Sequence, residues 1–312
     1  MLSQVAQLAN LHAAFGRVAE ARGGAGVDRL TIGAFRKNLD LNLASLASEL
    51  TSATYQPLPL LRFLVAKPNG SPRALVIPAV RDRVAQAAAL NILEPIFEAR
   101  FKEVSFAYRK GRSVKHAALR VKALRDKGYR YLLDADLDDF FHQIDHERLF
   151  ARLSQIVPDP GLLRLLRLWV RAEVYDGRQV YIMEKGLPQG AVISPLLSNL
   201  FLDEFDEALL ARGFQLVRYA DDFLVLTKTR AEAEAALHAS QEILTRLRLS
   251  LDPEDTQITH FDEGFKYLGL IFFKDAILAP FDRAPKKNQI LYMPPPFDLK
   301  AYLARKKSPS LR

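Results

Sequence analysis

The sharpest pattern of apolar and polar positions lies in residues 216–226, which read LVRYADDFLVL. An apolar run rich in β-branched and aromatic residues stands on each side of a short polar centre, which predicts two strands joined by a tight hairpin turn. Asp221 and Asp222 fall at or beside that turn. Aspartate is common in solvated turns, but two adjacent, partly buried carboxylates raise one pKa unless a positive group lies near. A divalent cation supplies that charge, and Mg²⁺ needs only one or two carboxylates together with substrate phosphates.

A second acidic segment ends the strand predicted over residues 131–137. Asp134, Asp136 and Asp138 have the same parity, so the twofold period of a strand places up to three carboxylates on one face. From Asp136 onward the predicted element order is β-α-(β)-α-β-β-α-β, which is close to a ferredoxin-like, split βαβ sheet. That topology brings the end of the first strand beside the hairpin turn.

The rest of the pattern predicts an α+β chain that begins with a helical extension over residues 1–57. Strands over residues 61–66 and 73–77 are joined by turn-forming residues, so Lys67 and Arg73 lie near the tip of a predicted hairpin. Such cations can clamp a triphosphate, or they can be solvated charges at a sheet edge. Further helices are predicted over residues 81–98, 113–127, 162–174, 194–210 and 231–249.

The composition is that of a globular protein, since 49% of the 312 residues are hydrophobic. No apolar run approaches the ~20 residues that span a bilayer, and the first residues lack the charged start and apolar core of a signal peptide. The chain contains no cysteine, which excludes a disulfide framework and a thiolate metal site. We therefore expect a cytoplasmic location and no membrane partner.

The net charge of +8 is unevenly distributed along the chain. Residues 61–130 have a net charge of +11 and residues 281–312 one of +6, so the remainder carries −9. Basic surfaces around an acidic site suit the binding of a polyanion, although solvated basic helix faces would give the same counts. The loop at residues 105–113 interleaves aromatic residues with arginine and lysine, which suits stacking on bases and contact with phosphates. The basic, proline-rich tail from residue 281 predicts a linker or docking segment rather than a domain.

In their order along the chain, these segments resemble a reverse transcriptase of the bacterial, group II intron-like kind. The resemblance runs from about residue 28 to about residue 270. The motifs that carry it are KPNG at 67–70 with RAL at 73–75, RDR at 81–83, SFAYRKGRS at 105–113, DL followed by FF at 136–141, LPQG at 187–190 with SPLLSN at 194–199, YADD at 219–222 and YLG at 267–269.

The resemblance implies a right-hand polymerase. Its fingers would span residues 58–130 and its ferredoxin-like palm residues 131–280, with some interleaving of the two around residues 150–190. The thumb would be short or absent, with residues 281–312 as a thumb remnant or linker. The implied activity is that of an RNA-directed DNA polymerase, which extends a DNA or RNA primer with dNTPs on an RNA template.

The resemblance also implies roles for individual residues. Two Mg²⁺ ions, with Mn²⁺ as a substitute, would be held by Asp136, Asp221 and Asp222, with Leu137 as a further metal-site residue. The ring of Phe141 would lie where a 2′-hydroxyl would fall, so that ribonucleotides are excluded. The other implied nucleotide-binding residues are Lys67, Arg73, Gln189 and Gly190. The implied nucleic-acid-binding residues are Arg109, Arg112, Tyr219, Tyr267, Leu268 and Gly269.

Two departures from the family pattern bear on function. Asp255 stands where the family usually has a lysine that is thought to help protonate pyrophosphate, and only about 40 residues follow the YLG motif, so we do not expect an intron mobility protein. Among host systems, a CRISPR integrase complex that acquires spacers from RNA is the favoured partner. A retron, an abortive-infection system and a diversity-generating system are alternatives. A non-catalytic nucleic-acid-binding scaffold is the alternative of another class, against which the intact aspartates argue, and Phe141 argues against an RNA-making enzyme.

Overall fold

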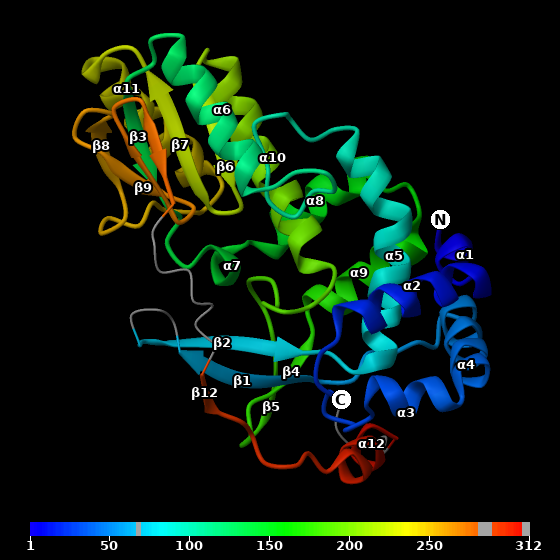
Figure 1. Cartoon of the computed structure of the whole chain (residues 1–312). Helices are drawn as coiled ribbons and strands as arrows, with labels where there is room; N and C mark the ends of the chain where they lie inside the picture. Colours follow the sequence, from blue (N-terminus) through cyan, green and yellow to red (C-terminus); the bar gives the residue numbers. More distant parts are fainter. Residues whose placement is uncertain (67–69, 280–288, 308–312) are drawn as a thin grey trace. The chain divides into compact units, whose positions relative to one another are not determined.

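The structure is a computed structural model, and it describes residues 1–66, 70–279 and 289–307. The chain divides into two compact units, each assembled from segments that are distant in the sequence. Both units combine helices with a β-sheet, which confirms the predicted α+β class (Figure 1). The first unit comprises Met1–Pro95, Leu153–Ser194 and Lys286–Arg312, and the second comprises Ile96–Arg152 and Pro195–Pro285. Residues 96–130, which were predicted to belong with the fingers, therefore lie in the second unit.

The helices of the first unit include the predicted N-terminal ones. They are α1 (Leu2–Val5), α2 (Leu8–Ala21), α3 (Ile32–Lys37), α4 (Leu39–Thr51), most of α5 (Val80–Glu98) and α9 (Pro160–Val170). Tyr55 connects two of them, because its hydroxyl donates to Asp82 Oδ1 on α5 (2.7 Å) and accepts from Trp169 Nε1 on α9 (3.1 Å). Among the helices of the described residues, none is both long and apolar enough to cross a bilayer.

The sheet of the first unit is built around β1. Its strands are β1 (Leu60–Ala66), β2 (Pro72–Ile77), β4 (Glu173–Tyr175), β5 (Val180–Ile182) and β12 (Ile290–Tyr292). β2 pairs antiparallel with one edge of β1, from Leu61 with Ile77 to Ala66 with Pro72, which confirms the predicted hairpin. The other edge of β1 pairs with β4 in parallel and with β12 in antiparallel orientation, and β5 pairs with β4. Lys67 lies outside the described residues.

Two segments of the first unit differ from the sequence prediction. The helix predicted over residues 162–174 ends at Val170, and Val174 lies in β4, because backbone pairing with β1 and β5 outweighs the local apolar pattern. The tail was predicted to be a linker or docking segment, but residues 290–292 form β12, and residues 299–307 form the helix α12 (Leu299–Lys307). Both differences come from contacts between segments that are distant in the sequence, which a local pattern does not report.

The sheet of the second unit contains the predicted hairpin. Its strands are β3 (Tyr131–Ala135), β6 (Gln215–Tyr219), β7 (Asp222–Thr227) and β8 (Gln257–His260). They lie in the order β6-β7-β3-β8, and every neighbouring pair is antiparallel. A smaller sheet has the order β11-β10-β9, formed by β9 (Phe265–Tyr267), β10 (Leu270–Phe273) and β11 (Ala276–Leu278).

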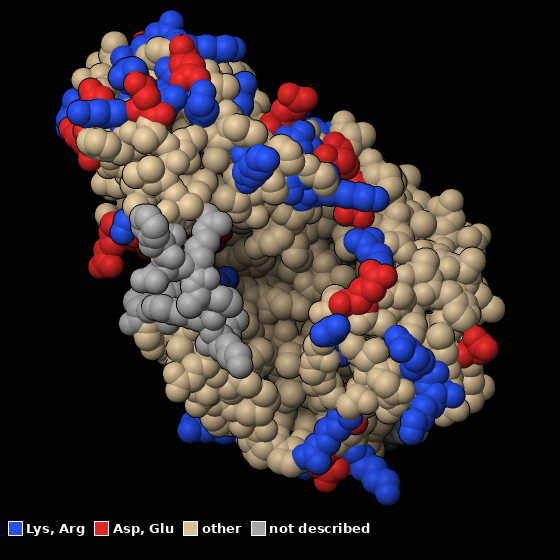
Figure 2. All heavy atoms as spheres, in the orientation of Figure 1, with Lys and Arg blue, Asp and Glu red and all other residues tan. Residues whose placement is uncertain are grey.

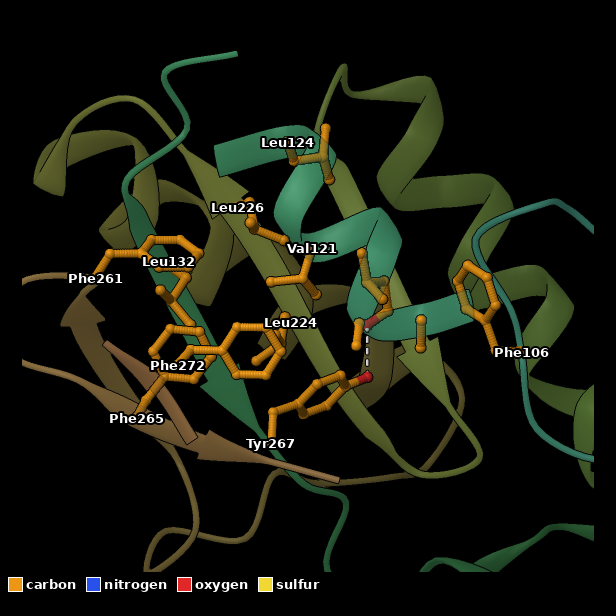
Figure 3. Packing of buried hydrophobic residues seen from close by; sticks show 13 residues of the cluster. Phe106, Val121, Leu124, Leu132, Leu224, Leu226, Phe261, Phe265, Tyr267 and Phe272 are labelled. Atoms are coloured by element: carbon orange, nitrogen blue, oxygen red, sulfur yellow. Dashed lines mark hydrogen bonds between the residues drawn. The ribbon is translucent and has the colours of Figure 1, made fainter. Parts of the chain in front are cut away.

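A buried apolar cluster lies on one face of the β3 sheet (Figure 3). Val121 and Leu124 of α6 (Val114–Asp126) pack there with side chains of the sheet and with the aromatic rings of the smaller sheet. On the other face, the Phe223 ring lies 5.0 Å from the ring of Phe205 on α10 (Ser194–Ala211). The remaining helices of this region are α7 (Phe140–Gln143), α8 (His146–Ile156) and α11 (Arg230–Arg246). Burial on both faces fixes the strand register, because a shift by one residue would exchange the two sets of side chains.

Candidate active site

The turn between β6 and β7 consists of Ala220 and Asp221, because Tyr219 and Asp222 are the last pair of the hairpin. Ala220 has a φ of 62°, a left-handed conformation that costs a residue with a Cβ about 1 kcal/mol. The Arg218 guanidinium donates a hydrogen bond from Nη1 to the Ala220 carbonyl oxygen at 2.9 Å. A side-chain hydrogen bond therefore stabilises the backbone conformation that presents Asp221.

Arg218 is buried, with 1% of its surface exposed. Its Nε and Nη2 atoms donate to the two carboxylate oxygens of Asp206 on α10, at 2.7 and 2.6 Å. Nη1 also donates to Asn199 Oδ1 at 3.1 Å, and the Asn199 amide donates to the Ala107 carbonyl oxygen at 2.8 Å. The backbone of Arg218 pairs with residues 104–106. One buried cation thus connects the Ala220–Asp221 turn, α10 and the loop that precedes α6.

Tyr267 supports the same hairpin from β9. Its side chain is buried, and its hydroxyl donates to the Val217 carbonyl oxygen at 3.2 Å and lies 3.5 Å from the Asp222 carbonyl oxygen (Figure 3). Leu268 and Gly269 form the turn that follows, with φ values of 52° and 73°. Tyr267 was predicted to bind nucleic acid, and the structure instead places it beneath the hairpin as a support.

Asp136 follows directly after β3, and Asp222 begins β7, the neighbour of β3. Burial raises the pKa of Asp222 to about 8, and the carboxylates of Asp136, Asp134 and Asp221 add to the rise. Burial and the Asp221 carboxylate likewise raise the pKa of Asp136 to about 7. Burial also raises the pKa of Asp134 to about 6, and Asp255 contributes to the rise at all three residues. The repulsion predicted for the Asp221–Asp222 pair therefore extends over a larger acidic face.

This acidic face suits a divalent cation by its donor chemistry. Carboxylate oxygens are the hard ligands that Mg²⁺ prefers, and burial together with mutual repulsion disfavours their ionised forms in the protein alone. In the part of the chain that the structure describes, no three histidine, cysteine, aspartate or glutamate side chains form a preformed metal-binding group. Asp136 Oδ1 accepts a hydrogen bond from the Leu137 amide at 2.9 Å. The arrangement fits a metal whose coordination is completed by substrate phosphates, as is usual for Mg²⁺.

In the first unit, three of the residues predicted to contact a nucleotide lie together, one of them in β2 and two next to it. Arg73 Nε donates to Gln189 Oε1 at 2.9 Å, and the Val76 amide donates to the Gln189 carbonyl oxygen at 2.8 Å. Gly190 has a φ of 111°, and a Cβ there would lie 2.3 Å from the Val76 carbonyl oxygen. Glycine is required at this position because the backbone approaches too closely for a side chain. Lys67, another of the five predicted nucleotide-binding residues, lies outside the described residues.

The two arginines of the loop at residues 105–113 that were predicted to bind nucleic acid have different surroundings. The Arg109 side chain is only 2% exposed, and it donates to the Glu98 carboxylate (2.6 Å from Nη2) and to the Lys102 and Ser105 carbonyl oxygens. Its guanidinium therefore holds the loop together and is not free to bind nucleic acid. Arg112 Nη1 donates to the Glu103 carbonyl oxygen at 2.8 Å, and the residue lines a polar cavity whose other charged or titratable residues are Lys110, His116, Arg120, Glu98 and Glu103.

Phe141 lies on α7, where it is 6% exposed and its ring packs edge-on against Phe140 at 5.4 Å. Asp139, which precedes the helix, has a left-handed φ of 41°. Tyr219 is partly buried and packs against the apolar cluster of the β3 sheet. These positions agree equally with a core aromatic role and with a role at the border of a substrate site.

Many cations of the basic stretch at residues 61–130 are paired with carboxylates. The paired residues include Arg81, Arg109, Lys122, Arg125 and Arg130. Figure 2 shows basic and acidic side chains intermixed over the end of the second unit that carries α6 and α11. Glu98 and Asp126 are already counted in the net charge of the stretch, so among these pairs only those of Arg81 with Glu49 and Arg130 with Asp275 further reduce the positive charge that is free to bind a polyanion.

Sequence reasoning missed the buried pair of Arg218 and Asp206. The available signal was a single arginine between Val217 and Tyr219 in an otherwise apolar strand. A charged residue at a fully buried position needs a partner. The partner lies on α10, 12 residues earlier in the chain, and no local pattern identifies it.

Comparisons with known proteins identify the family of the chain. Residues 65–272 match the family described as reverse transcriptase (RNA-dependent DNA polymerase). The chain is 35% identical to the protein YkfC of Escherichia coli, over 78% of this chain and 74% of YkfC. It is 32% identical to the group II intron-encoded protein LtrA of Lactococcus lactis subsp. cremoris, over 54% of this chain and 28% of LtrA. A chain of the solved partial Cas6-RT-Cas1–Cas2 complex is 27% identical with a TM-score of 0.49, and the match covers 79% of this chain and 41% of that one.

An acidic face beside a braced Asp-Asp hairpin is thus found in a chain whose sequence matches nucleic acid polymerases. The chain belongs to the reverse transcriptase (RNA-dependent DNA polymerase) family and has relatives encoded by group II introns. This confirms the predicted resemblance and the enzyme class.

The buried pair makes a first prediction. Arg218→Met leaves Asp206 buried without a partner, which should cost about 3–5 kcal/mol of unfolding free energy. The double variant Arg218→Met, Asp206→Leu should recover most of that stability, but primer extension should stay at least about tenfold below the wild type because the Ala220 carbonyl has lost its support. Urea denaturation and single-turnover extension measure the two effects.

Arg212→Met is the control for that prediction. Arg212 forms a more exposed ion pair with Glu242, so its loss should change stability by less than about 1 kcal/mol. Extension at the wild-type rate by the stable double variant would contradict the positioning role.

The raised pKa of Asp222 makes a second prediction. Its folded value of about 8 lies above the ordinary 3.8, so the fold disfavours the ionised form, and the resulting loss of stability grows as pH rises from about 4 to about 8. With divalent cations chelated, Asp222→Asn should therefore be more stable than the wild type by up to about 5 kcal/mol at pH 8, and the difference should fall to about 1 kcal/mol at pH 4.5. Urea denaturation at both pH values measures the unfolding free energy. A difference between variant and wild type that is the same at both pH values would refute the repulsion between Asp222 and its neighbouring carboxylates.

Proposed function

We propose that this chain is an RNA-directed DNA polymerase that adds deoxynucleotides to a primer 3′-hydroxyl on an RNA template by two-metal catalysis. The observation that carries the proposal is the acidic face on adjacent strands, where Asp136 and Asp222 have raised pKa values and Asp221 occupies the turn between β6 and β7. Membership of the reverse transcriptase family supports the same reaction.

The residues at and around the acidic face have different proposed roles. Asp136, Asp221 and Asp222 would hold two Mg²⁺ ions, with Leu137 as a further metal-site residue. When bound, such a pair lowers the pKa of the primer hydroxyl and neutralises the charge that develops on the leaving pyrophosphate. Arg218 and Tyr267 hold the hairpin that carries two of the three carboxylates.

The second unit is proposed to be the palm of a right-hand polymerase, and the β1–β2 hairpin part of its fingers. In chain order the strands of the palm sheet are β3, β6, β7 and β8, and in space they lie in the order β8-β3-β7-β6. An antiparallel sheet in this order, with α11 between β7 and β8, supports the predicted ferredoxin-like arrangement.

The nucleotide site is proposed to draw on the group beside β2. Arg73 supplies a cation for the triphosphate, and its hydrogen bond to Gln189 fixes the direction of the guanidinium. Gly190 leaves the backbone open to close approach by a base or a template strand. Lys67 is proposed as a second triphosphate ligand on the family resemblance alone.

The biological role is proposed from the sequence resemblance, with a CRISPR integrase as partner in acquiring spacers from RNA. Retron, abortive-infection and diversity-generating systems are the competing roles. Purification of the tagged protein from its own host, followed by mass spectrometry, tests this: integrase subunits in the complex would support the role, and a purified chain without them would contradict it.

The catalytic proposal predicts that Asp136→Asn and Asp221→Asn reduce Mg²⁺-dependent extension of a DNA primer on an RNA template by at least about a thousandfold. Affinity for the primer–template should change little, because each variant removes one charge from an acidic face. Asp138→Asn is a matched control, since Asp138 is an exposed carboxylate just beyond β3. Extension by the Asp221→Asn, Asp222→Asn double variant would show that the chain is a scaffold or uses another site.

The sugar-selection proposal predicts that Phe141→Ala increases the incorporation of ribonucleotides relative to deoxynucleotides by at least about tenfold. The reason is steric, because removal of the ring opens the space that a 2′-hydroxyl would occupy. Single-nucleotide kinetics with matched dNTP and rNTP pairs measure the ratio, and Phe140→Ala controls for loss of packing at α7. An unchanged ratio would assign Phe141 to the core alone.

A further inference from the structure

The C-terminal part of the described chain adds a strand to the hairpin that carries Arg73 (Figure 1). β12 pairs antiparallel with the outer half of β1, at Leu64 and Val65. On its other side, Val65 pairs with Arg73 of β2, so Val65 lies between Arg73 and Ile290 in one row of the sheet. Only β1 therefore separates β12 from β2, the strand that contains Arg73 of the proposed nucleotide site.

The pairing with β12 adds a third strand to the outer half of the β1–β2 hairpin. On the edge of β1 that faces away from β2, β4 pairs with Leu60 and Leu61 only. Further along that edge the partner is β12, and the Ala66 amide donates to the Gln289 carbonyl oxygen at 2.9 Å. Without β12, the outer half of the β1–β2 hairpin would be a two-stranded ribbon, which is at best marginally stable in water.

The turn between β4 and β5 is shaped around the same segment. Gly177 in this turn has a φ of 100°, and a Cβ there would lie 2.1 Å from Tyr292 Oη and 3.0 Å from Pro294 Cβ. The Tyr292 hydroxyl donates to the Asp176 carbonyl oxygen at 3.3 Å. Pro294 is buried, whereas Met293 and Pro295 on either side of it are exposed.

A second contact anchors the segment beyond its prolines. The Phe297 ring lies 4.7 Å from the Tyr175 ring of β4. Glu173, also on β4, accepts hydrogen bonds from the Tyr302 hydroxyl and, at 2.8 Å, from Lys306 Nζ. The exposed ion pair adds little stability, and the apolar side chains of β12 are themselves 39–55% exposed. The contact therefore depends on backbone pairing, Pro294 and Phe297.

We propose that residues 289–306 are a built-in brace for the β1–β2 hairpin, and that the brace positions Arg73 and its partner Gln189 for nucleotide binding. The effect on nucleotides rests on the proposed polymerase function, whereas the bracing of the hairpin does not. The segment acts within its own chain, which differs from the partner docking predicted from its sequence.

The test compares Pro294→Asp with Pro296→Asp in the full chain. The first places a charge at a buried contact of the brace, and the second places the same charge at an exposed proline two residues later. Hydrogen exchange of residues 64–66, 73 and 74 reports on the hairpin without any need for activity, and residues 60–61, which β4 also covers, serve as the internal reference. We expect at least about tenfold faster exchange in Pro294→Asp and no change in Pro296→Asp.

Steady-state kinetics on one primer–template test the consequence. Pro294→Asp should raise the KM for dNTP by at least about threefold while kcat and the affinity for primer–template stay within about twofold. Gly177→Leu, which opposes the segment from the other side, should have the same effects, with Gly213→Leu as the control because Gly213 shares the left-handed φ but has open space around it.

Unchanged exchange in both Pro294→Asp and Gly177→Leu would overturn the brace. Faster exchange with an unchanged KM for dNTP would overturn its role in positioning Arg73. If the wild type extends no primer at all while exchange still accelerates in the variants, the proposed polymerase function fails and the brace stands.

Discussion

Repulsion among partly buried carboxylates on one face of the β3 sheet is the constraint on which the candidate site of the second unit depends. Asp136 and Asp222 lie on adjacent strands, and burial and their acidic neighbours raise both pKa values. Such an arrangement destabilises the protein by itself, so the surrounding structure must hold it. The Arg218–Asp206 pair and the Tyr267 hydroxyl provide this support, and both act on the backbone of the hairpin rather than on the carboxylates. They fix the turn without neutralising the charge that a metal would need.

Each unit supports a short hairpin, and the contacts that support it differ between the two units. In the second unit, α10 and the loop before α6 hold a strained turn through a buried cation. In the first unit, β12 pairs with the hairpin that carries Arg73, and the β4–β5 turn fits closely against the β12 segment at Gly177. In both cases, segments that are remote in the sequence support a short hairpin.

The sequence predicted the parts of this structure that depend on local order. The two apolar runs on either side of Asp221 and Asp222 predicted β6, β7 and their turn, and the shared parity of Asp134, Asp136 and Asp138 predicted an acidic face beside it. It did not predict the contacts between distant segments. The pairing of Val174 with β1, the buried partner of Arg218 and the docking of β12 each join residues whose local patterns are ambiguous. Arg109 is a further example. The motif identifies its position in the loop, but only the tertiary structure shows that its guanidinium is paired with Glu98.

The central claim is that Asp136, Asp221 and Asp222 gather to hold divalent cations on the face of the β3 sheet. Anomalous diffraction from crystals of the protein grown with primer–template, a non-hydrolysable dNTP and Mn²⁺ tests this most directly. The account predicts two anomalous peaks about 4 Å apart, each within ligand distance of these carboxylates and of the triphosphate. Mn²⁺ bound elsewhere, with these three side chains free of metal in a ternary complex, would contradict it.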